Sequence, residues 1–294
     1  MKNLLTLLAG LRSLIVHKLY VEQVFSSINK DDLILEIGGG YNPRFCKDTF
    51  KNVYHLDHHD TEKLKAKYLA DINVSHLVHR IQDVDFVFNG DPIESLIPRT
   101  LQFDYIYSSH ALEHQVDFIG HLRSLERVLK PNGKVIMIIP DHRACFDRLR
   151  FPTVTSDVLA VHLRRQSVHQ GKQVFEALAQ GIDVNPGRRV NKLDLSTAGF
   201  FHSLESAYEA ACASETDSAT YFDVHAWTFT PVSFKLLVVE LFLLNLTSFK
   251  LLQVTPTYGN QFCVVLSPSS LAERENMEKH FDQVRYRLCR KLFS

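Results

Sequence analysis

The 294-residue chain lacks an excess of charge of either sign, and this excludes one broad class of partner. Its 33 Lys and Arg residues balance its 33 Asp and Glu residues, so the formal net charge is zero. Domains that bind nucleic acid usually carry a basic patch or stripe that neutralises phosphates. We therefore expect no nucleic-acid partner.

The chain also lacks any cysteine pattern and any long apolar run. Its five cysteines are odd in number and never stand in C-x-x-C spacing. We therefore expect reduced thiols and a cytoplasmic location, without a disulfide framework or a structural zinc site. No apolar run approaches the length of about 20 residues that a membrane span needs. The hydrophobic content of 45% and the charged content of 22% are typical of a globular protein.

Both ends of the chain predict helices. Residues 1–25, within the N-terminal segment 1–29, resemble a signal peptide only superficially, because Arg12 interrupts the apolar stretch and no small-residue cleavage site follows. We interpret this segment as a helix packed on the protein, with peripheral membrane contact as the alternative. Residues 268–294 predict a C-terminal helix with a solvated basic face. The apolar face of the N-terminal helix consists of Leu4, Leu8, Leu11 and Ile15.

The most informative segment is an apolar run that ends in a glycine turn. Leu33–Ile37 predicts a buried parallel strand that contains Glu36, and Gly38, Gly39 and Gly40 follow it directly. Pro43 suits the first position of a helix. It also replaces the last glycine of the G-x-G-x-x-G fingerprint and removes an N–H group from a pyrophosphate site. A cofactor without phosphate fits this turn better than a dinucleotide does, and an ordinary tight turn is the alternative.

Strand-like and helix-like segments alternate through the first half of the chain, and a helix and two strands close the second half. This order predicts a doubly wound, Rossmann-like α/β sheet of seven mostly parallel strands, with an antiparallel last strand. The strands are expected at 33–37, 53–57, 84–88, 103–107, 134–139, 250–254 and 261–266, with a helix over 231–244 before the last two.

A long interval without clear strands separates the two parts of the sheet. Residues 142–229 contain helical stretches at 173–180 and 204–213, and a segment of this length is expected to be a functional helical cap. We therefore divide the chain into an N-terminal helical segment, a core, an inserted cap and a C-terminal helix. These cover 1–29, 30–141 with 230–267, 142–229 and 268–294.

These features together resemble the class I S-adenosylmethionine-dependent methyltransferases. The resemblance covers roughly residues 30–141 and 230–267, through the glycine turn, the strand-end Asp57, the run 103–114 and the run 125–134. The segments 140–153 and 223–234 are similar to a bacterial subgroup often associated with polysaccharide biosynthesis. The third residue of the glycine turn and His142 depart from the usual pattern of that subgroup.

The resemblance implies that the cofactor is S-adenosylmethionine, with binding residues near the carboxyl ends of the first four strands. Glu36 and the Gly38–Gly40 backbone are expected against its methionine part. Asp57 is expected to accept hydrogen bonds from the ribose hydroxyls. Asp91 is expected to bind the adenine amino group, with Gly90 allowing close approach. His58 and Ser109 complete the expected set. The alternatives are a solvated strand-end charge for Asp57 and an Asx turn for Asp91.

The acceptor implied by the resemblance is a sugar or glycan hydroxyl, or another small molecule. A hydroxyl must lose a proton during transfer, so a general base near neutral pKa is useful and histidine is the natural supplier. Our candidates are His110 and His114 after the fourth strand, His225 in the cap, and Asp141 as an orienting or sugar-binding residue. His114 has a helix-start role as its alternative. Trp227 is either a sugar-stacking platform or a core anchor.

Three other readings remain open from the sequence. The acceptor could be a nitrogen or a small metabolite, which needs less help from a base. The chain could also be a non-catalytic scaffold that binds S-adenosylmethionine. His110, Glu113 and His114, with His142 or His225, offer enough ligands for a metal. Because no second anchoring motif accompanies them, we predict no metal site.

Overall fold

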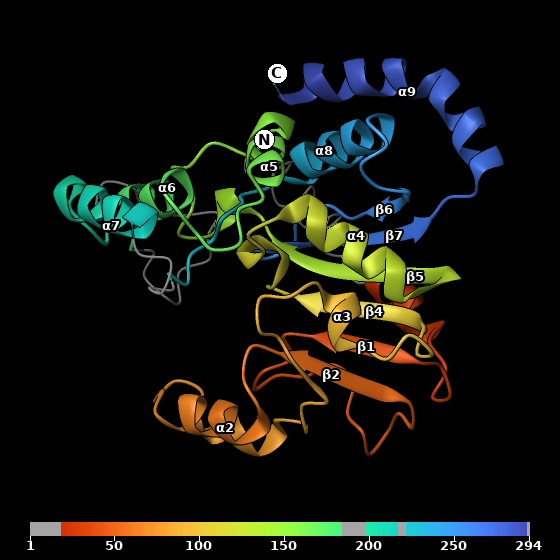
Figure 1. Cartoon of the computed structure of the whole chain (residues 1–294), viewed down its shortest axis with the longest axis horizontal. Helices are drawn as coiled ribbons and strands as arrows, with labels where there is room; N and C mark the ends of the chain where they lie inside the picture. Colours follow the sequence, from red (N-terminus) through yellow and green to blue (C-terminus); the bar gives the residue numbers. More distant parts are fainter. Residues whose placement is uncertain (1–18, 184–197, 217–221, 293–294) are drawn as a thin grey trace, which may run out of the picture.

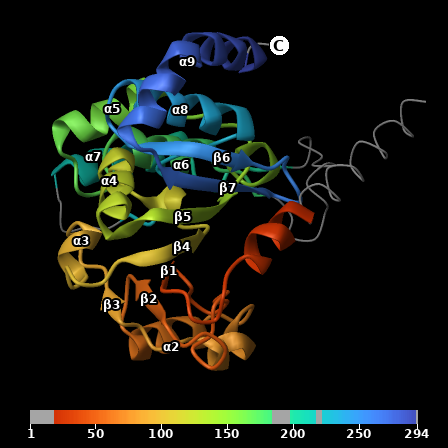
Figure 2. The same cartoon turned by 90° about the vertical axis from the view of Figure 1, so that its right-hand side faces the viewer.

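The computed structural model describes residues 19–183, 198–216 and 222–292. Its centre is one seven-stranded sheet in the order β3-β2-β1-β4-β5-β7-β6 (Figures 1 and 2). All neighbours pair in parallel except β7, which is antiparallel to both β5 and β6. The predicted fold class is confirmed. The strands are β1 (Ile34–Ile37), β2 (Val53–Asp57), β3 (Phe86–Val87), β4 (Phe103–Ser109), β5 (Leu129–Pro140), β6 (Phe249–Val254) and β7 (Gln261–Pro268).

Helices connect the strands and cover the sheet, and local capping explains where several of them begin. The Asp60, Asp117 and Thr230 side chains each accept a hydrogen bond from a first-turn amide, at the starts of α2, α4 and α8. The helices are α2 (Thr61–Leu69), α3 (Ile93–Leu96), α4 (Phe118–Val128), α5 (Thr155–Arg164), α6 (Lys172–Gln180), α7 (Leu204–Thr216), α8 (Pro231–Leu243) and α9 (Leu271–Leu292), with short 3₁₀ turns η1 (Ser75–Arg80), η2 (Leu112–His114) and η3 (His142–Ala144).

The two faces of the sheet are covered unequally. On one face α4 and α8 contribute a large apolar core with residues such as Leu122, Phe234 and Leu237. On the other face a smaller cluster is covered by helical residues 19–26 and by the loop residues Phe45 and Phe50. The C-terminal helix α9 packs on α8 through Phe281 and Phe242, outside the sheet (Figure 1). No helix in the described ranges is long and apolar enough to cross a membrane.

The helix expected after the glycine turn is absent from the described chain, so this expectation for Pro43 is wrong. Residues 38–52 form turns and bends between β1 and β2. The Glu36 carboxylate accepts hydrogen bonds from the Arg44 and Phe45 amides at 2.7 and 2.8 Å, and these contacts hold the chain in a compact loop. The N-terminal face of Leu4, Leu8, Leu11 and Ile15 lies outside the described residues.

The segment 142–229 contains α5, α6 and α7, in agreement with the helical stretches expected there. In Figure 1, α6 and α7 lie together at one end of the molecule, away from the sheet. The beginning and end of the segment are joined by backbone hydrogen bonds. The His142 amide donates to the Phe229 carbonyl, and the Thr153 amide donates to the Thr228 carbonyl. The Ala226 amide donates to the Glu113 carbonyl at 2.7 Å, which ties the returning strand segment to η2.

Candidate active site

The glycine turn after β1 has a backbone that other residues would strain. Gly38 and Gly40 have φ values of +70° and +47°, a region that residues with a Cβ rarely adopt. A Cβ on Gly40 would lie 3.0 Å from the Tyr68 hydroxyl, and one on Gly38 would lie 3.4 Å from the Ala111 Cβ. The turn is therefore closely lined by α2 on one side and by the start of the η2 turn on the other.

Asp57 lies at the end of β2 beside this turn. Its Oδ2 accepts a hydrogen bond from the Gly40 amide at 3.1 Å, and its Oδ1 accepts one from the His58 amide at 2.8 Å. The His58 ring nitrogen Nδ1 lies 2.6 Å from the same Oδ1. Burial opposes ionisation, but these contacts hold the pKa of the Asp57 carboxyl below its ordinary value. The residue is thus a charged acceptor at the edge of the turn.

The amides of this loop are already bound by carboxylates, and this decides which ligands fit. Asp57 takes the Gly40 amide, and Glu36 takes those of Arg44 and Phe45. A phosphate would need such amides and would meet two carboxylates instead. A ribose with two hydroxyl donors and a positively charged sulfonium group suits these acceptors, since Asp57 Oδ2 and both Glu36 oxygens each accept one hydrogen bond and keep a second lone pair. The residues present therefore fit S-adenosylmethionine.

The residues expected to bind adenine are more exposed than Asp57, which is expected to bind the ribose. Asp91 and Gly90 lie on the exposed loop after β3, where Gly90 has a φ of +95°. The Asp91 amide donates to the Asn89 side chain at 3.0 Å, and the Asn89 amide group donates to Asp91 Oδ2 at 2.9 Å. Asn89 Oδ1 accepts the amide two residues further on, as in the Asx turn that was the alternative for this loop. Ser109 is the last residue of β4 and is half-buried.

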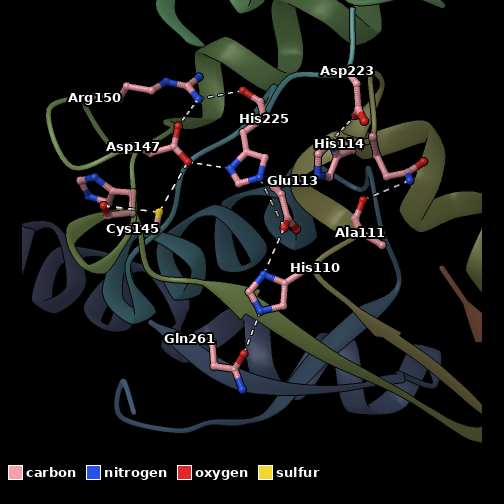
Figure 3. A network of polar contacts seen from close by, with 12 residues as sticks. His110, Ala111, Glu113, His114, Cys145, Asp147, Arg150, Asp223, His225 and Gln261 are labelled. Atoms are coloured by element: carbon pink, nitrogen blue, oxygen red, sulfur yellow. Dashed lines mark hydrogen bonds and ion pairs between the residues drawn. The ribbon is translucent and has the colours of Figure 1, made fainter. Parts of the chain in front are cut away.

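The chain after β4 turns sharply at His110. This residue has a φ of +51°, which is unusual for a residue with a Cβ. Its Nε2 lies 2.7 Å from Gln261 Oε1 on β7, and its Nδ1 lies 3.6 Å from Glu113 Oε1. A helix starting directly after β4 would place His110 and His114 one turn apart on one face. The left-handed residue and the short η2 turn replace that helix, and both imidazoles still reach Glu113 and its neighbours (Figure 3).

Glu113 is fully buried at the centre of these side chains. His225 Nε2 approaches its Oε1 at 3.9 Å, from the segment that returns out of the cap. The other ring nitrogen, Nδ1, lies 2.6 Å from Asp147 Oδ2, and Arg150 Nη1 donates to Asp147 Oδ1 at 2.8 Å. Burial opposes ionisation of Asp147, but His225 and Arg150 hold its pKa below its ordinary value.

His114 joins the same group from the other side. Its ring lies edge-on to that of His225, with centroids 4.7 Å apart. Its Nδ1 lies 2.9 Å from Asp223 Oδ1. Burial disfavours the charged ring, but Asp223 and Glu113 raise the pKa of His114 above its ordinary value. Three of the four predicted catalytic residues thus meet around one carboxylate.

A family model described as a methyltransferase domain matches residues 16–178, which is more than half of the chain. The chain belongs to this methyltransferase family. The matched range contains the glycine turn, Asp57 and the turn of His110 to His114, whereas His225 and Gln261 lie beyond it.

Comparisons with individual proteins add little to this assignment. A search of curated proteins finds no match. Among solved structures, the CcbJ methyltransferase from Streptomyces caelestis has 11% identity and a TM-score of 0.44, over 85% of this chain and 88% of that one. A methyltransferase from Aquifex aeolicus has 12% identity and a TM-score of 0.39, over 83% and 87%. The mitomycin 7-O-methyltransferase MmcR has 12% identity and a TM-score of 0.38 over 84% of this chain, which spans about half of its length (52%).

Asp141 does not join the histidines of this methyltransferase. Its carboxylate pairs with Arg143, with Nη2 at 2.6 Å from Oδ2, and accepts a hydrogen bond from the Thr257 hydroxyl. It therefore fixes the loop after β5. Trp227 is a core residue, because its ring is buried and its indole N–H donates to the Gln115 carbonyl. The stacking-platform alternative for Trp227 is wrong.

The sequence reasoning gave no role to four residues that line the methyltransferase site. Tyr68 lies against Gly40, and burial together with the Asp57 charge raises its pKa to about 12. Gln261 contacts His110, while Asp147 and Arg150 support His225. Asp147 and Arg150 fall in segment 140–153, whose resemblance to the bacterial subgroup was a signal for them, whereas Gln261 was marked only by its place at the start of a predicted strand.

Proposed function

We propose that this methyltransferase transfers the methyl group of S-adenosylmethionine to a hydroxyl group of a sugar or glycan. One observation carries the proposal. The Ala111 side chain lies against Gly38, so the turn that bears His110 and His114 adjoins the glycine turn beside Asp57. A proton acceptor for the acceptor hydroxyl is thereby available next to the cofactor site.

The cofactor is S-adenosylmethionine, which supplies an activated methyl group on a sulfonium. Asp57 would hold the ribose hydroxyls, and Glu36, Gly38, Gly39 and Gly40 would line the methionine part. The chain contributes mainly by holding the acceptor in line with the methyl group and by excluding water. The two buried carboxylates, Glu36 and Asp57, also favour a positively charged ligand over an anionic one.

His110 is the proposed general base. Its Nε2 proton is donated to Gln261 Oε1 at 2.7 Å, which leaves the lone pair on Nδ1 to accept a proton. At 37% side-chain exposure, it is the most accessible of the three clustered histidines. The segment 142–229 would form the acceptor site, because it carries Asp223 and His225 to the same turn.

Cofactor binding is the first test of the proposal. Titration calorimetry should detect S-adenosylmethionine binding to the wild-type chain. Asp57→Ala should weaken it by at least about 100-fold, or about 2.7 kcal/mol. His162→Gln, which removes an imidazole paired with Asp117, is the control and should bind as the wild type does. Absence of wild-type binding, or equal binding by Asp57→Ala, would overturn the cofactor site.

The acceptor is tested separately. Mass spectrometry of surface polysaccharide from a strain without this gene should show the loss of a methyl group. With a purified glycan, His110→Ala should lower the turnover rate by about 100-fold or more while leaving cofactor affinity unchanged. Full activity of His110→Ala would instead support a nitrogen acceptor, and an unchanged polysaccharide would exclude the glycan.

A further inference from the structure

The Glu113 carboxylate is a buried charged group that the described protein does not satisfy. Its exposed fraction is 0%, and neither oxygen accepts a hydrogen bond from any residue in the described ranges. Burying a carboxylate without a hydrogen-bond or ionic partner costs several kcal/mol of desolvation free energy. Its own backbone is well held, because the Glu113 carbonyl accepts the Ala226 and Trp227 amides. The side chain is therefore fixed in position and faces a group that must neutralise it.

We infer that Glu113, His114 and His225 bind a divalent transition-metal ion. One carboxylate oxygen and one nitrogen from each ring all lie within 4.8 Å of one another. The best-defined pair, Glu113 Oε1 and His225 Nε2, is 3.9 Å apart. Metal bonds of about 2.0–2.2 Å place two tetrahedral ligands about 3.4 Å apart. Closing the site around an ion thus requires shifts of well under an ångström for this pair.

Residues behind both imidazoles orient them as metal ligands are usually oriented. Asp147 Oδ2 lies 2.6 Å from His225 Nδ1, which directs the lone pair of Nε2 toward Glu113. Arg150 fixes Asp147 and also donates to the His225 carbonyl at 2.7 Å. Asp223 lies 2.9 Å from His114 Nδ1 (Figure 3). The hydrogen bond that His225 Nδ1 donates to Asp147 fixes the tautomer of His225 and raises its basicity toward a metal. Asp223 is an ion-pair neighbour of His114, whose Nδ1 makes no hydrogen bond within the described ranges.

The ligand types select the class of ion. Two imidazoles and one carboxylate suit zinc, iron(II), cobalt or manganese, whereas magnesium and calcium prefer oxygen ligands. Three protein ligands also leave positions for a solvent or substrate oxygen. His110 is not part of this trio, because among the described residues only the ligand atoms of Glu113, His114 and His225 lie within 4.8 Å of one another. Its Nε2 contacts Gln261, and its Nδ1 faces Glu113 Oε1 at 3.6 Å from outside the group. The sequence alone favoured no metal, since the ligands come from η2 and from the end of segment 142–229, far apart in the chain.

The site itself does not depend on the assigned reaction, but its role in catalysis rests on the proposed function. Two of the three ligands, Glu113 and His114, lie on the turn that adjoins the glycine loop through Ala111 and Gly38. An ion there would stand on the acceptor side of the cofactor and could hold an acceptor oxygen while His110 takes the proton. An oxygen-rich acceptor such as a sugar fits this arrangement.

Metal binding is measured without S-adenosylmethionine, so that it is independent of the cofactor assignment. The full chain is stripped with a chelator, dialysed, and titrated with Zn²⁺ or Co²⁺ by calorimetry and elemental analysis. We expect one ion per chain and an absorption spectrum of bound Co²⁺ with low coordination number. Glu113→Gln should weaken binding at least 100-fold, and Asp147→Asn about 10- to 100-fold. His162→Gln is the matched control and should bind as the wild type does.

Two results would overturn the site. One is the absence of stoichiometric Zn²⁺ or Co²⁺ binding by the wild-type chain, and the other is equal affinity in Glu113→Gln. Circular dichroism checks that each variant is folded, and Glu113→Gln keeps the shape of the side chain it replaces. Calorimetry of S-adenosylmethionine binding in the presence of chelator reports on the cofactor site alone. A failed metal site with intact cofactor binding, or the reverse, therefore shows which assignment is wrong.

Discussion

Two buried glutamates lie at neighbouring places on the same edge of the sheet, and the chain treats them differently. Glu36 in β1 and Glu113 after β4 are 1% and 0% exposed. Glu36 accepts two backbone hydrogen bonds from one short loop. Glu113 accepts none from the described residues and is surrounded by imidazoles from several segments. Equal burial therefore accompanies two different environments: the protein's own amides satisfy the Glu36 carboxylate, whereas no hydrogen bond from the described residues satisfies that of Glu113.

The two glutamates also have histidine neighbours whose pKa values shift in opposite directions. Burial raises the pKa of Glu36 to about 7, although its two amide donors and Arg44 act in the opposite direction. Burial lowers the pKa of its neighbour His55 to about 4. At the other glutamate, the pKa of His114 is raised. The surroundings of Glu36 thus disfavour a protonated His55, whereas the surroundings of Glu113 favour a protonated His114.

Removing the Glu36 side chain should have the largest effect. Glu36→Ala leaves the Arg44 and Phe45 amides without their acceptor, and two charge-assisted bonds of about 1.5–3 kcal/mol each are lost. We expect the free energy of unfolding to fall by about 3–5 kcal/mol in urea titrations. Glu36→Gln keeps one acceptor oxygen and should lose about half as much. A loss below about 1 kcal/mol in Glu36→Ala would show that the loop is held otherwise.

The second-largest expected effect is the loss of folding stability at acid pH through His55. The pKa of His55 is about 4 in the folded chain and 6.5 ordinarily. Its contribution is therefore present above pH 6.5 and is lost as the pH falls toward 4. The wild type should lose on the order of 3 kcal/mol over this window through His55. His55→Gln should show a smaller loss, whereas the exposed-residue control His79→Gln should follow the wild type. Parallel curves for all three would contradict the assignment.

Neutralising Glu113 should have a smaller effect of opposite sign. In the presence of chelator, Glu113→Gln removes a buried carboxylate that accepts no hydrogen bond from the described residues, and it should raise the free energy of unfolding by about 1 kcal/mol. The same urea titrations measure it. A loss of more than about 2 kcal/mol would mean that the carboxylate is stabilised within the protein, and the contrast with Glu36 would disappear.

The pair of His114 and Asp223 should contribute least. Asp223 is 58% exposed, and ion pairs in contact with water contribute at most about 1 kcal/mol. Asp223→Asn should therefore lower the free energy of unfolding by less than about 1 kcal/mol at pH 5–6. A loss near that of Glu36→Ala would show that this pair anchors the cap.

The sequence was sufficient for most of the sheet because its strands have local signatures. Apolar runs identified β1, β5 and β7, and the alternation of strands and helices predicted a doubly wound, mostly parallel sheet. The third strand was expected over 84–88 but pairs only over Phe86–Val87, since it is an edge strand that contacts β2 alone. The helix expected at Pro43 does not form, because the Arg44 and Phe45 amides donate to the Glu36 side chain instead. Such contacts between a side chain and the backbone leave no periodic pattern in the sequence.

The candidate site was only partly predictable for a physical reason. His110 and His114 could be found because they follow a strand end within five residues. Their partners could not, because Gln261 is 151 residues from His110, and Asp147 is 78 residues from His225. Only folding brings these side chains together. Trp227 shows the opposite case: its position near the site suggested a sugar-binding platform, but its ring is buried in the core.

The backbone hydrogen bonds at the two ends of segment 142–229 have a consequence for the position of His225. The residues that follow His225 are joined to Glu113, Thr153 and His142 through the backbone. None of these bonds involves α6 or α7, so the placement of the His225 ring beside Glu113 is independent of how those two distal helices are held.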